Sequence, residues 1–430
     1  MNPILSPNNS FLPLNQLWSH CTRLLSSLDD GRIDQKERLS HEQTLWNEVK
    51  KIRTLKLDTT VYLYLIGYYH TILYHVGDSH STDDLFQYHV LIRLGDLNRY
   101  LDKVDVSEYY YCSARNLFPY YGHAYNQLGL LTKPTNCFKC CYYYARAARS
   151  THRPLNKIAD SNLRIAVNKY NCELLNHILN EQTIIGIDKI ESESLPKTAL
   201  EWFYVIVVAI YADNIQSIAP LFLHYLSANF STQKATTYRE DTKTTTIFCD
   251  HESYILLADL DILLDWLKMS SNFEVPQSKI SQELGQIRTS LKNIASSINN
   301  EWLVNSMSVD SPTNSNIQVE SSSNISGDRS NTTDLSLSLS HRKILALPHD
   351  YILRGFAPLD PIHDRLKFGS QSTSKTFIEY NLVNDGKRFI HGEHLCQVML
   401  RIKIKIDSLG IATKKRTRNI ALESILSNIN

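Results

Sequence analysis

The chain has 430 residues, with 45 Lys and Arg against 44 Asp and Glu, which gives a formal net charge of +1. This balance excludes the overall basic field that duplex nucleic-acid binders use, so any recognition by charge must be local. The chain contains only 14 Gly and 13 Pro, too few to punctuate many short strands and hairpins.

Apolar residues recur with helical spacing along most of the chain, which predicts an all-α fold. The predicted helices lie at about 14–25, 45–52, 61–76, 165–178, 200–211, 215–226 and 254–267. The most apolar run, 203–212, is about half of the roughly 20 residues that span a bilayer. We therefore expect a buried helix there and no membrane segment.

A repeat is the strongest signal in the sequence. Two Leu-Gly pairs end at Gly95 and Gly129, which are 34 residues apart, the length of a tetratricopeptide unit. Tyr111 is the large aromatic expected in the second helix of the first copy, whereas Ala145 stands at that position in the second copy. The small packing positions of the second helix are occupied by Ser107, Ala114, Cys141 and Ala148.

These offsets predict two tandem tetratricopeptide-type helix pairs near residues 88–154. Such units stack because none buries its apolar face alone, and the stack leaves a curved groove for a partner protein. The alternative is a coincidental pair of Leu-Gly dipeptides in unrelated helices.

Two polar stretches interrupt the predicted helices. Residues 228–246 are rich in Thr and predict a surface loop, and residues 307–338 are dominated by Ser and Asn and predict a disordered insertion. Its serines are either phosphorylation sites or part of an inert linker, and the linker is the simpler reading.

The sequence lacks the motifs of catalytic chemistry. No G-x-S-x-G, HExxH, P-loop or GxGxxG pattern occurs, so we expect a protein that is not an enzyme and has no cofactor. Cys137, Cys140 and Cys141 have CxxC spacing, but no second half of a zinc site follows, which favours buried helix cysteines over metal ligands.

The cysteine pattern and the N-terminus also bear on location. Eight cysteines are scattered along the chain, and no apolar leader follows a basic start, so we expect a reducing, cytoplasmic location. The basic run at 414–418 is either a nuclear signal, which would allow shuttling, or a solvated helix end.

Cations gather at two places near the repeats. Lys50, Lys51 and Arg53 follow Trp46, and Arg146 and Arg149 follow three consecutive tyrosines. A phosphoserine carries a charge of about −1.5 to −2 and three strong acceptor oxygens, so cations that converge in one groove would bind it. Ordinary surface cations are the alternative.

Several motifs in this region resemble those of the Est-one/SMG adaptors of nonsense-mediated mRNA decay and telomere maintenance, whose N-terminal domain is 14-3-3-like. The motifs are LWN at 45–47, LGDLNRY at 94–100, YNQL at 125–128, YYYAR at 142–146 and SNL at 161–163. Two later stretches, ILLDWLK at 262–268 and LPHD at 347–350, resemble the helical-hairpin region of the family. The resemblance runs from about residue 40 to 400.

The resemblance implies a 14-3-3-like domain at 1–225 and a helical-hairpin extension at 226–430. It implies that Lys51 and Arg146 grip a phosphoserine and that Asn162 contacts the backbone of the bound peptide. Two features depart from the family: the interval from Arg146 to Asn162 is longer, and Ala147 stands where 14-3-3 proteins have a tyrosine.

The implied partners follow from the family's role in mRNA decay. They are a phosphorylated up-frameshift RNA helicase, a heterodimer partner of the SMG-five or SMG-seven type, and a phosphatase or mRNA decay factors, with no sequence-specific nucleic acid. The presence of both Lys51 and Arg146 favours the SMG-seven type. A phosphate-independent scaffold and a telomerase or RNA-binding accessory protein remain the alternatives.

Overall fold

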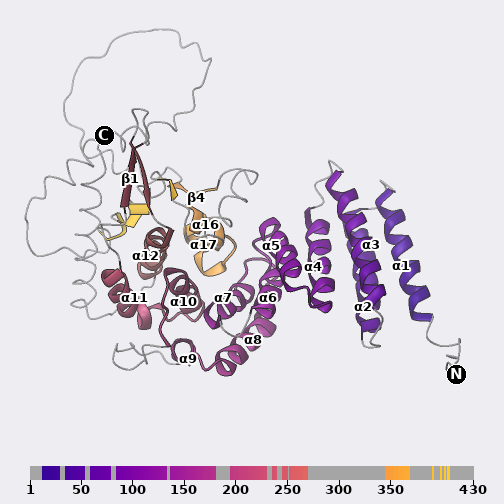
Figure 1. Ribbon diagram of the computed structural model, residues 1–430, viewed down its shortest axis with the longest axis horizontal. Coiled ribbons are helices and arrows are strands. Elements are labelled where there is room, and N and C mark those ends of the chain that lie inside the picture. The colour runs from indigo at the N-terminus through magenta and orange to yellow at the C-terminus, as the bar shows by residue number, and fades with distance from the viewer. Residues whose placement is uncertain are drawn as a thin grey trace, which may run out of the picture. The chain divides into compact units, whose positions relative to one another are not determined.

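A computed structural model describes the parts of the chain that carry the fold (Figure 1). The described residues are 12–29, 34–53, 59–78, 84–132, 136–180, 194–229, 235–239, 245–249, 251–269, 344–368, 390–391, 398–399, 401–402 and 404–406. They belong to two compact units. Unit 1 comprises Met1–Asn136 with Tyr143–Leu163, and unit 2 comprises Cys137–Tyr142 with Arg164–Asn430.

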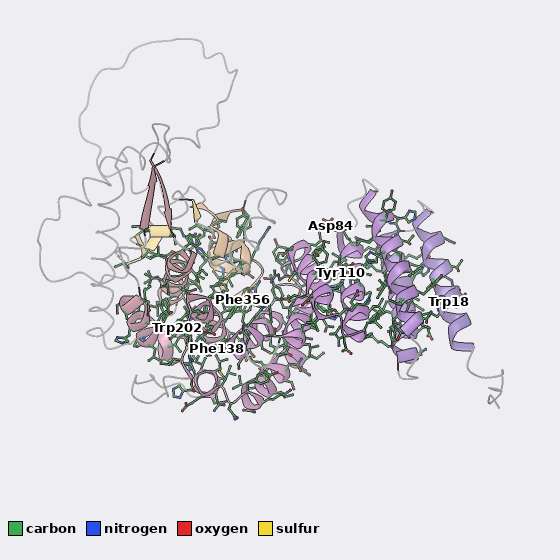
Figure 2. All side chains as sticks on the ribbon, viewed as in Figure 1. Trp18, Asp84, Tyr110, Phe138, Trp202 and Phe356 are labelled. Carbon is green, nitrogen blue, oxygen red and sulfur yellow. The ribbon has the colours of Figure 1, made fainter. Side chains whose placement is uncertain are left out.

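Unit 1 is built from helices that follow one another along the chain. They are α1 (Leu12–Asp29), α2 (Gln35–Arg53), α3 (Thr59–Asp78), α4 (Asp84–Tyr100), α5 (Val104–Leu117), α6 (Gly122–Leu131), the second half of α7 (Cys137–Ala148) and the first half of α8 (Asn156–Lys169). Each of the first three contains one of the helices predicted before residue 80. Apolar side chains from successive helices fill the spaces between them, with Trp18 and Tyr110 marked in Figure 2.

Glycines set the distance between paired helices at both predicted repeats. A Cβ atom on Gly95 of α4 would lie 2.3 Å from the ring of Tyr111 on α5, and one on Gly129 of α6 would lie 2.6 Å from the ring of Tyr144 on α7. The aromatic partner of the second pair is therefore Tyr144, one residue before Ala145. The sequence analysis missed it because the count assumed a strict period of 34, whereas the register of α7 differs by one residue.

The start of α6 is held against the end of α7. A Cβ atom on Gly122 would lie 2.4 Å from the backbone oxygen of Ala147, a distance that no side chain could accept. Tyr121 and His152 form an isolated β-bridge beside this contact. The close approach fixes where the side chains of α7, including Arg146, meet α6.

Unit 2 is also mainly helical. Its named helices are the first half of α7, the second half of α8, α9 (Glu173–Asn180), α10 (Ala199–Tyr211), α11 (Ile215–Asn229), α12 (His251–Met269), α16 (Pro348–Leu353), the 3-10 helix η4 (Ala357–Leu359) and α17 (Asp360–His363). Helix α10 is buried almost throughout and begins with a capping box of Thr198 and Glu201. The all-α prediction is confirmed for the body of both units, and short strands are the exception.

The predicted loop at 228–246 is wrong over part of its length. Strand β1 (Ala235–Arg239) pairs antiparallel with β2 (Thr245–Cys249), and β5 (Ile390–His391) extends this sheet. The strands contain Thr, Tyr, Ile and Phe, which favour extended structure although the stretch reads as polar. A second pairing joins β3 (Ile344–Leu345) in parallel to β4 (Leu366–Lys367).

Some sequence predictions are not addressed by the described residues. The Ser-rich insertion at 307–338 and the basic run at 414–418 lie outside them. The domain boundary near residue 225 stays a prediction. Within the described helices, no stretch is long and apolar enough to cross a membrane.

A buried ionic cluster in unit 2 joins α12 and α16 to Arg401 and Lys405. Arg401 donates from Nη1 to Asp350 Oδ2 at 2.6 Å, and its Nη2 lies 2.8 Å from Asp261 Oδ2. Asp261 also accepts from Lys405 and contacts His349 Nε2 at 3.1 Å. The LPHD stretch therefore has a structural role here, since His349 of α16 contacts Asp261 of α12 and Asp350 binds Arg401, which also binds Asp261.

Another carboxyl group of α12 differs from those of the cluster in its surroundings. Asp259 on α12 is fully buried, and among the described residues no group lies within hydrogen-bonding distance of its side-chain oxygens. Burial raises the pKa of Asp259 well above its ordinary value. The raised pKa favours the neutral form of the side chain, which costs less than the charged form to place among apolar side chains.

Candidate functional site

The predicted site residue Arg146 lies on α7 and is fully buried. Its Nη2 donates to the hydroxyl of Tyr125 at 2.8 Å, and its guanidinium lies over the Tyr125 ring, 4.6 Å from the centroid. The same hydroxyl donates to the backbone oxygen of Pro119 at 3.3 Å. Tyr125 on α6 thus contacts Arg146 through both its hydroxyl and its ring.

Asn162, the predicted peptide contact, lies on α8 and is half-buried. Its Nδ2 donates to Oδ1 of Asn126 at 3.0 Å. Asn126 follows Tyr125 directly on α6, so consecutive residues of one helix contact Arg146 and Asn162. The structure brings these two predicted residues to the same helix, although they are 16 positions apart in the chain.

Lys51, the third predicted residue, lies on α2 and is mainly exposed, with 71% of its side chain accessible. Its Nζ is 2.6 Å from Glu48 Oε1, one turn earlier on the same helix. The preceding residue, Lys50, acts on a different part of unit 1, since its charge contributes to lowering the pKa of His123 on α6. Lys50 therefore has an electrostatic effect on α6.

Charged side chains of α2 and α4 influence the ring of His123 on α6. Burial is the main reason that its pKa is lowered, and the charges of Arg93, Lys50 and Arg99 lower it further against the opposing effect of Asp96. Gln127 lies 3.1 Å from the His123 ring. The pKa of His89 falls to about 4, mainly through burial. Both histidines are neutral at pH 7, so the positive charge of this region comes from lysine and arginine.

Arg93 forms an ion pair with Glu42. Its Nε lies 2.7 Å from Oε1 of Glu42, and its Nη2 lies 3.2 Å from Oε2, while its guanidinium stacks over Trp46 at 4.5 Å. Both members of the pair are almost fully buried. This pair joins α2 to α4 and so positions the lysines at the end of α2.

Sequence reasoning assigned no role to Tyr125 or Asn126 and named Lys50 only as one of three cations that follow Trp46. The signal for the first two was the YNQL motif, which was noted as a family pattern without a contact to either site residue. For Lys50, no signal distinguishes two adjacent lysines until the rotation of α2 is known. Among the described residues, no group of three or more potential ligands could hold a metal ion.

Part of the chain is similar to a known protein family. Residues 107–250 match the family model of the Est1 DNA/RNA binding domain. The match is limited to that segment, which is similar to the Est1 model. The predicted resemblance is confirmed there, and the segment includes Tyr125, Arg146 and Asn162.

Two further comparisons concern a solved structure and the curated proteins. The solved structure "Structure of the C. elegans SMG5-SMG7 complex" aligns at 13% sequence identity with a TM-score of 0.37, covering 91% of this chain and 94% of that chain. A comparison with curated proteins gave no significant match.

Proposed function

We propose that the chain is a non-enzymatic adaptor of nonsense-mediated mRNA decay that binds a phosphoserine segment of a partner protein through unit 1. The observation that carries this proposal is the contact of Arg146 and Asn162 with neighbouring residues of α6, inside the segment that matches the Est1 model. By family resemblance, the partner is a phosphorylated up-frameshift RNA helicase.

Binding requires a change at Tyr125. Arg146 is fully buried, and Tyr125 contacts it through both its hydroxyl and its ring. A phosphate forms stronger, charge-assisted hydrogen bonds than a neutral hydroxyl does, so it has the chemistry to replace the Tyr125 hydroxyl as partner of Arg146. Tyr125 therefore competes with the phosphate in this proposal.

Charge reversal on α2 tests which lysine takes part. We expect Lys51→Glu to weaken binding of a phosphoserine peptide from the helicase by about 10–100-fold, because a hydrogen bond to a charged group contributes about 1.5–3 kcal/mol. Isothermal titration calorimetry with the full chain measures the loss. Lys36→Glu, an exposed position on the same helix, makes the same charge change and should leave the affinity within about threefold.

Two further variants and the unphosphorylated peptide complete the binding test. A loss confined to Lys50→Glu would transfer the role to Lys50, whose charge acts on α6. If neither lysine variant weakens binding, or if the unphosphorylated peptide binds equally well, the phosphate site is wrong. Tyr125→Phe keeps the ring over Arg146 but removes the competing hydroxyl, so it should preserve or tighten phosphopeptide binding.

A phosphate-independent assembly role is the second candidate, and an exposed face of unit 1 favours it. Large apolar side chains are exposed on α3 and α5, with Leu63 at 49%, Tyr64 at 54%, Tyr74 at 70% and Tyr109 at 67% accessibility. A hydrogen-bonding contact of 3.0 Å between His70 and Tyr110 joins the two helices. Exposed aromatic residues are typical of protein interfaces. By resemblance, the partner would be a protein of the SMG-five type.

Substitutions on this face test the assembly role. We expect Tyr74→Lys and Tyr109→Lys each to weaken association with a purified SMG-five-type protein at least about tenfold, because aromatic residues dominate binding energy at interfaces. Sedimentation velocity measures the association. Ile158→Lys, at a residue of α8 with 57% exposure, is the matched control. Unchanged association in both tyrosine variants would contradict the assignment.

Location, downstream partners and RNA binding are the remaining parts of the proposed role. We propose a cytoplasmic location, with recruitment of a phosphatase or decay factors as the downstream step. An RNA-binding accessory role, which the description of the family model also suggests, would show as binding to RNA that weakens steeply with salt in a filter-binding titration.

A further inference from the structure

Two arginines of unit 1 lie over tyrosines at the start of α6. The guanidinium of Arg146 is 4.6 Å from the ring centroid of Tyr125, and the guanidinium of Arg153 is 5.2 Å from the ring centroid of Tyr121. Tyr121 is the N-cap residue of α6, and Tyr125 follows four residues later, about 6 Å along the helix axis. The two tyrosines that contact these arginines are therefore about one turn apart.

The backbone of Arg153 has a conformation that an arginine rarely adopts. Its φ is 47°, in the left-handed region. Among the described residues, the other non-Gly residues with a positive φ are of types that tolerate this region, and each stands two positions after a helix: Asp102, Asn171 and Asp213. A glycine would adopt the conformation without strain, so the backbone does not account for an arginine at this position.

Backbone contacts fix Arg153 beside the start of α6. The amide of His152 donates to the carbonyl oxygen of Tyr120 at 2.9 Å, and the amide of Gly122 donates to the carbonyl oxygen of Arg153 at 3.4 Å. Tyr121 and His152 form the β-bridge between these bonds. The side chain of Arg153 is nevertheless exposed. Strained residues that the surrounding structure holds in place are typical of binding sites.

We propose that Arg153 is a further cation of the phosphate site and binds the phosphoserine of the partner segment together with Arg146. This inference rests on the proposed function. A phosphoserine carries a charge of about −1.5 to −2 and three strong acceptor oxygens, so it accepts hydrogen bonds from two guanidinium groups at once. The spacing of Tyr121 and Tyr125 places the two arginines over adjacent turns of one helix.

The two arginines differ in how a phosphate reaches them. Arg146 is fully buried against Tyr125, whereas Arg153 is exposed, so a phosphate that approaches from solvent contacts Arg153 without a change in the structure. A guanidinium that stacks on an aromatic ring directs its N–H groups outward in its own plane, where they donate to an anion. Arg153 would therefore hold the phosphate while Tyr125 gives up its hydrogen bond to Arg146.

Isothermal titration calorimetry with the full chain tests the role of Arg153. The probes are a serine-phosphorylated peptide of the helicase and the same peptide without phosphate. We expect Arg153→Gln to weaken binding of the phosphorylated peptide by about 10–100-fold, because it removes a hydrogen bond to a charged group. Lys157→Gln, at an exposed position four residues later, makes the same charge change and should leave the affinity within about threefold.

Arg153→Gly separates binding from a structural role. Glycine adopts a φ of 47° freely, so the thermal midpoint of the variant should stay the same or rise, whereas its affinity for the phosphorylated peptide should fall as in Arg153→Gln. Circular dichroism measures the midpoint. A midpoint lower by more than about 3 °C, with unchanged affinity in both variants, would assign Arg153 to the structure of the loop and overturn the proposal.

The peptide pair distinguishes a failure of this inference from a failure of the proposed function. A preference for the phosphorylated peptide that survives undiminished in Arg153→Gln overturns the role of Arg153 and leaves the phosphate site standing. Equal binding of the two peptides to the wild-type protein overturns the phosphate site, and the role of Arg153 with it.

Discussion

Replacing Arg401 by Met is expected to lower the free energy of unfolding of unit 2 by about 3–5 kcal/mol, because it removes the arginine that binds the buried Asp350 carboxylate and leaves Asp261 with Lys405 alone of its two cations. The Arg401 side chain is 8% accessible and binds Asp350 and Asp261 at the same time. Met keeps most of the volume and removes the charge. Thermal and urea denaturation followed by circular dichroism measures the loss.

The loss of stability in Arg401→Met depends on pH, and the pKa shifts of Asp261 and Asp350 give the direction of this dependence. Burial alone would raise the pKa of Asp261, but Lys405 and Arg401 outweigh it and hold the pKa well below its ordinary value. The pKa of Asp350 is also lowered, since His349 and Arg401 outweigh the effect of its burial. A carboxyl with a lowered folded pKa contributes stability above its unfolded pKa, about 3.9, and loses it as pH falls further.

The difference between the wild-type protein and Arg401→Met should therefore be largest near neutral pH and shrink below about pH 4. Arg365→Met, at an exposed arginine of the same unit, is the control and should change stability by no more than about 0.5 kcal/mol. A loss that is small near neutral pH would show that the cluster contributes little to the stability of unit 2.

The second large effect is expected at the pair formed by Glu42 and Arg93 in unit 1. Glu42→Gln should cost about 3–5 kcal/mol, because it leaves the guanidinium of Arg93 buried without its carboxylate. The hydroxyl of Tyr69 also donates to Glu42 Oε1 at 3.2 Å, so the substitution disturbs a contact with α3 as well. Urea denaturation followed by circular dichroism gives the change in the free energy of unfolding.

A double-mutant cycle separates the ion pair from the packing around it. Glu42→Leu and Arg93→Met should each be at least as damaging as Glu42→Gln, whereas the two combined should cost much less than the sum of these single changes. Glu37→Gln, at an exposed position of α2, is the control for removing a negative charge from this helix. Strictly additive single and double changes would contradict the buried pair.

Local patterns were sufficient to predict much of the fold. Helical spacing predicted α1, α2, α3 and the helices of unit 2 from α10 to α12, because a helix that packs on one side repeats its apolar residues every three to four positions. The period of the Leu-Gly pairs located both glycines that admit an aromatic ring. The same period misplaced the aromatic of the second pair, since the register of α7 depends on its packing against α6.

The sequence by itself determined α1 to α3, α10 to α12, the two glycines of the Leu-Gly pairs, and the family motifs around Arg146 and Asn162, whereas the single helix predicted at 165–178 is divided between α8 and α9. Only the tertiary structure decided that Tyr125 covers Arg146, that Asn162 contacts Asn126, and that the charge of Lys50 influences His123 on α6. The physical reason is that spacing along the chain fixes local geometry. Contacts between distant segments depend on how helices rotate and pack, which no short pattern encodes.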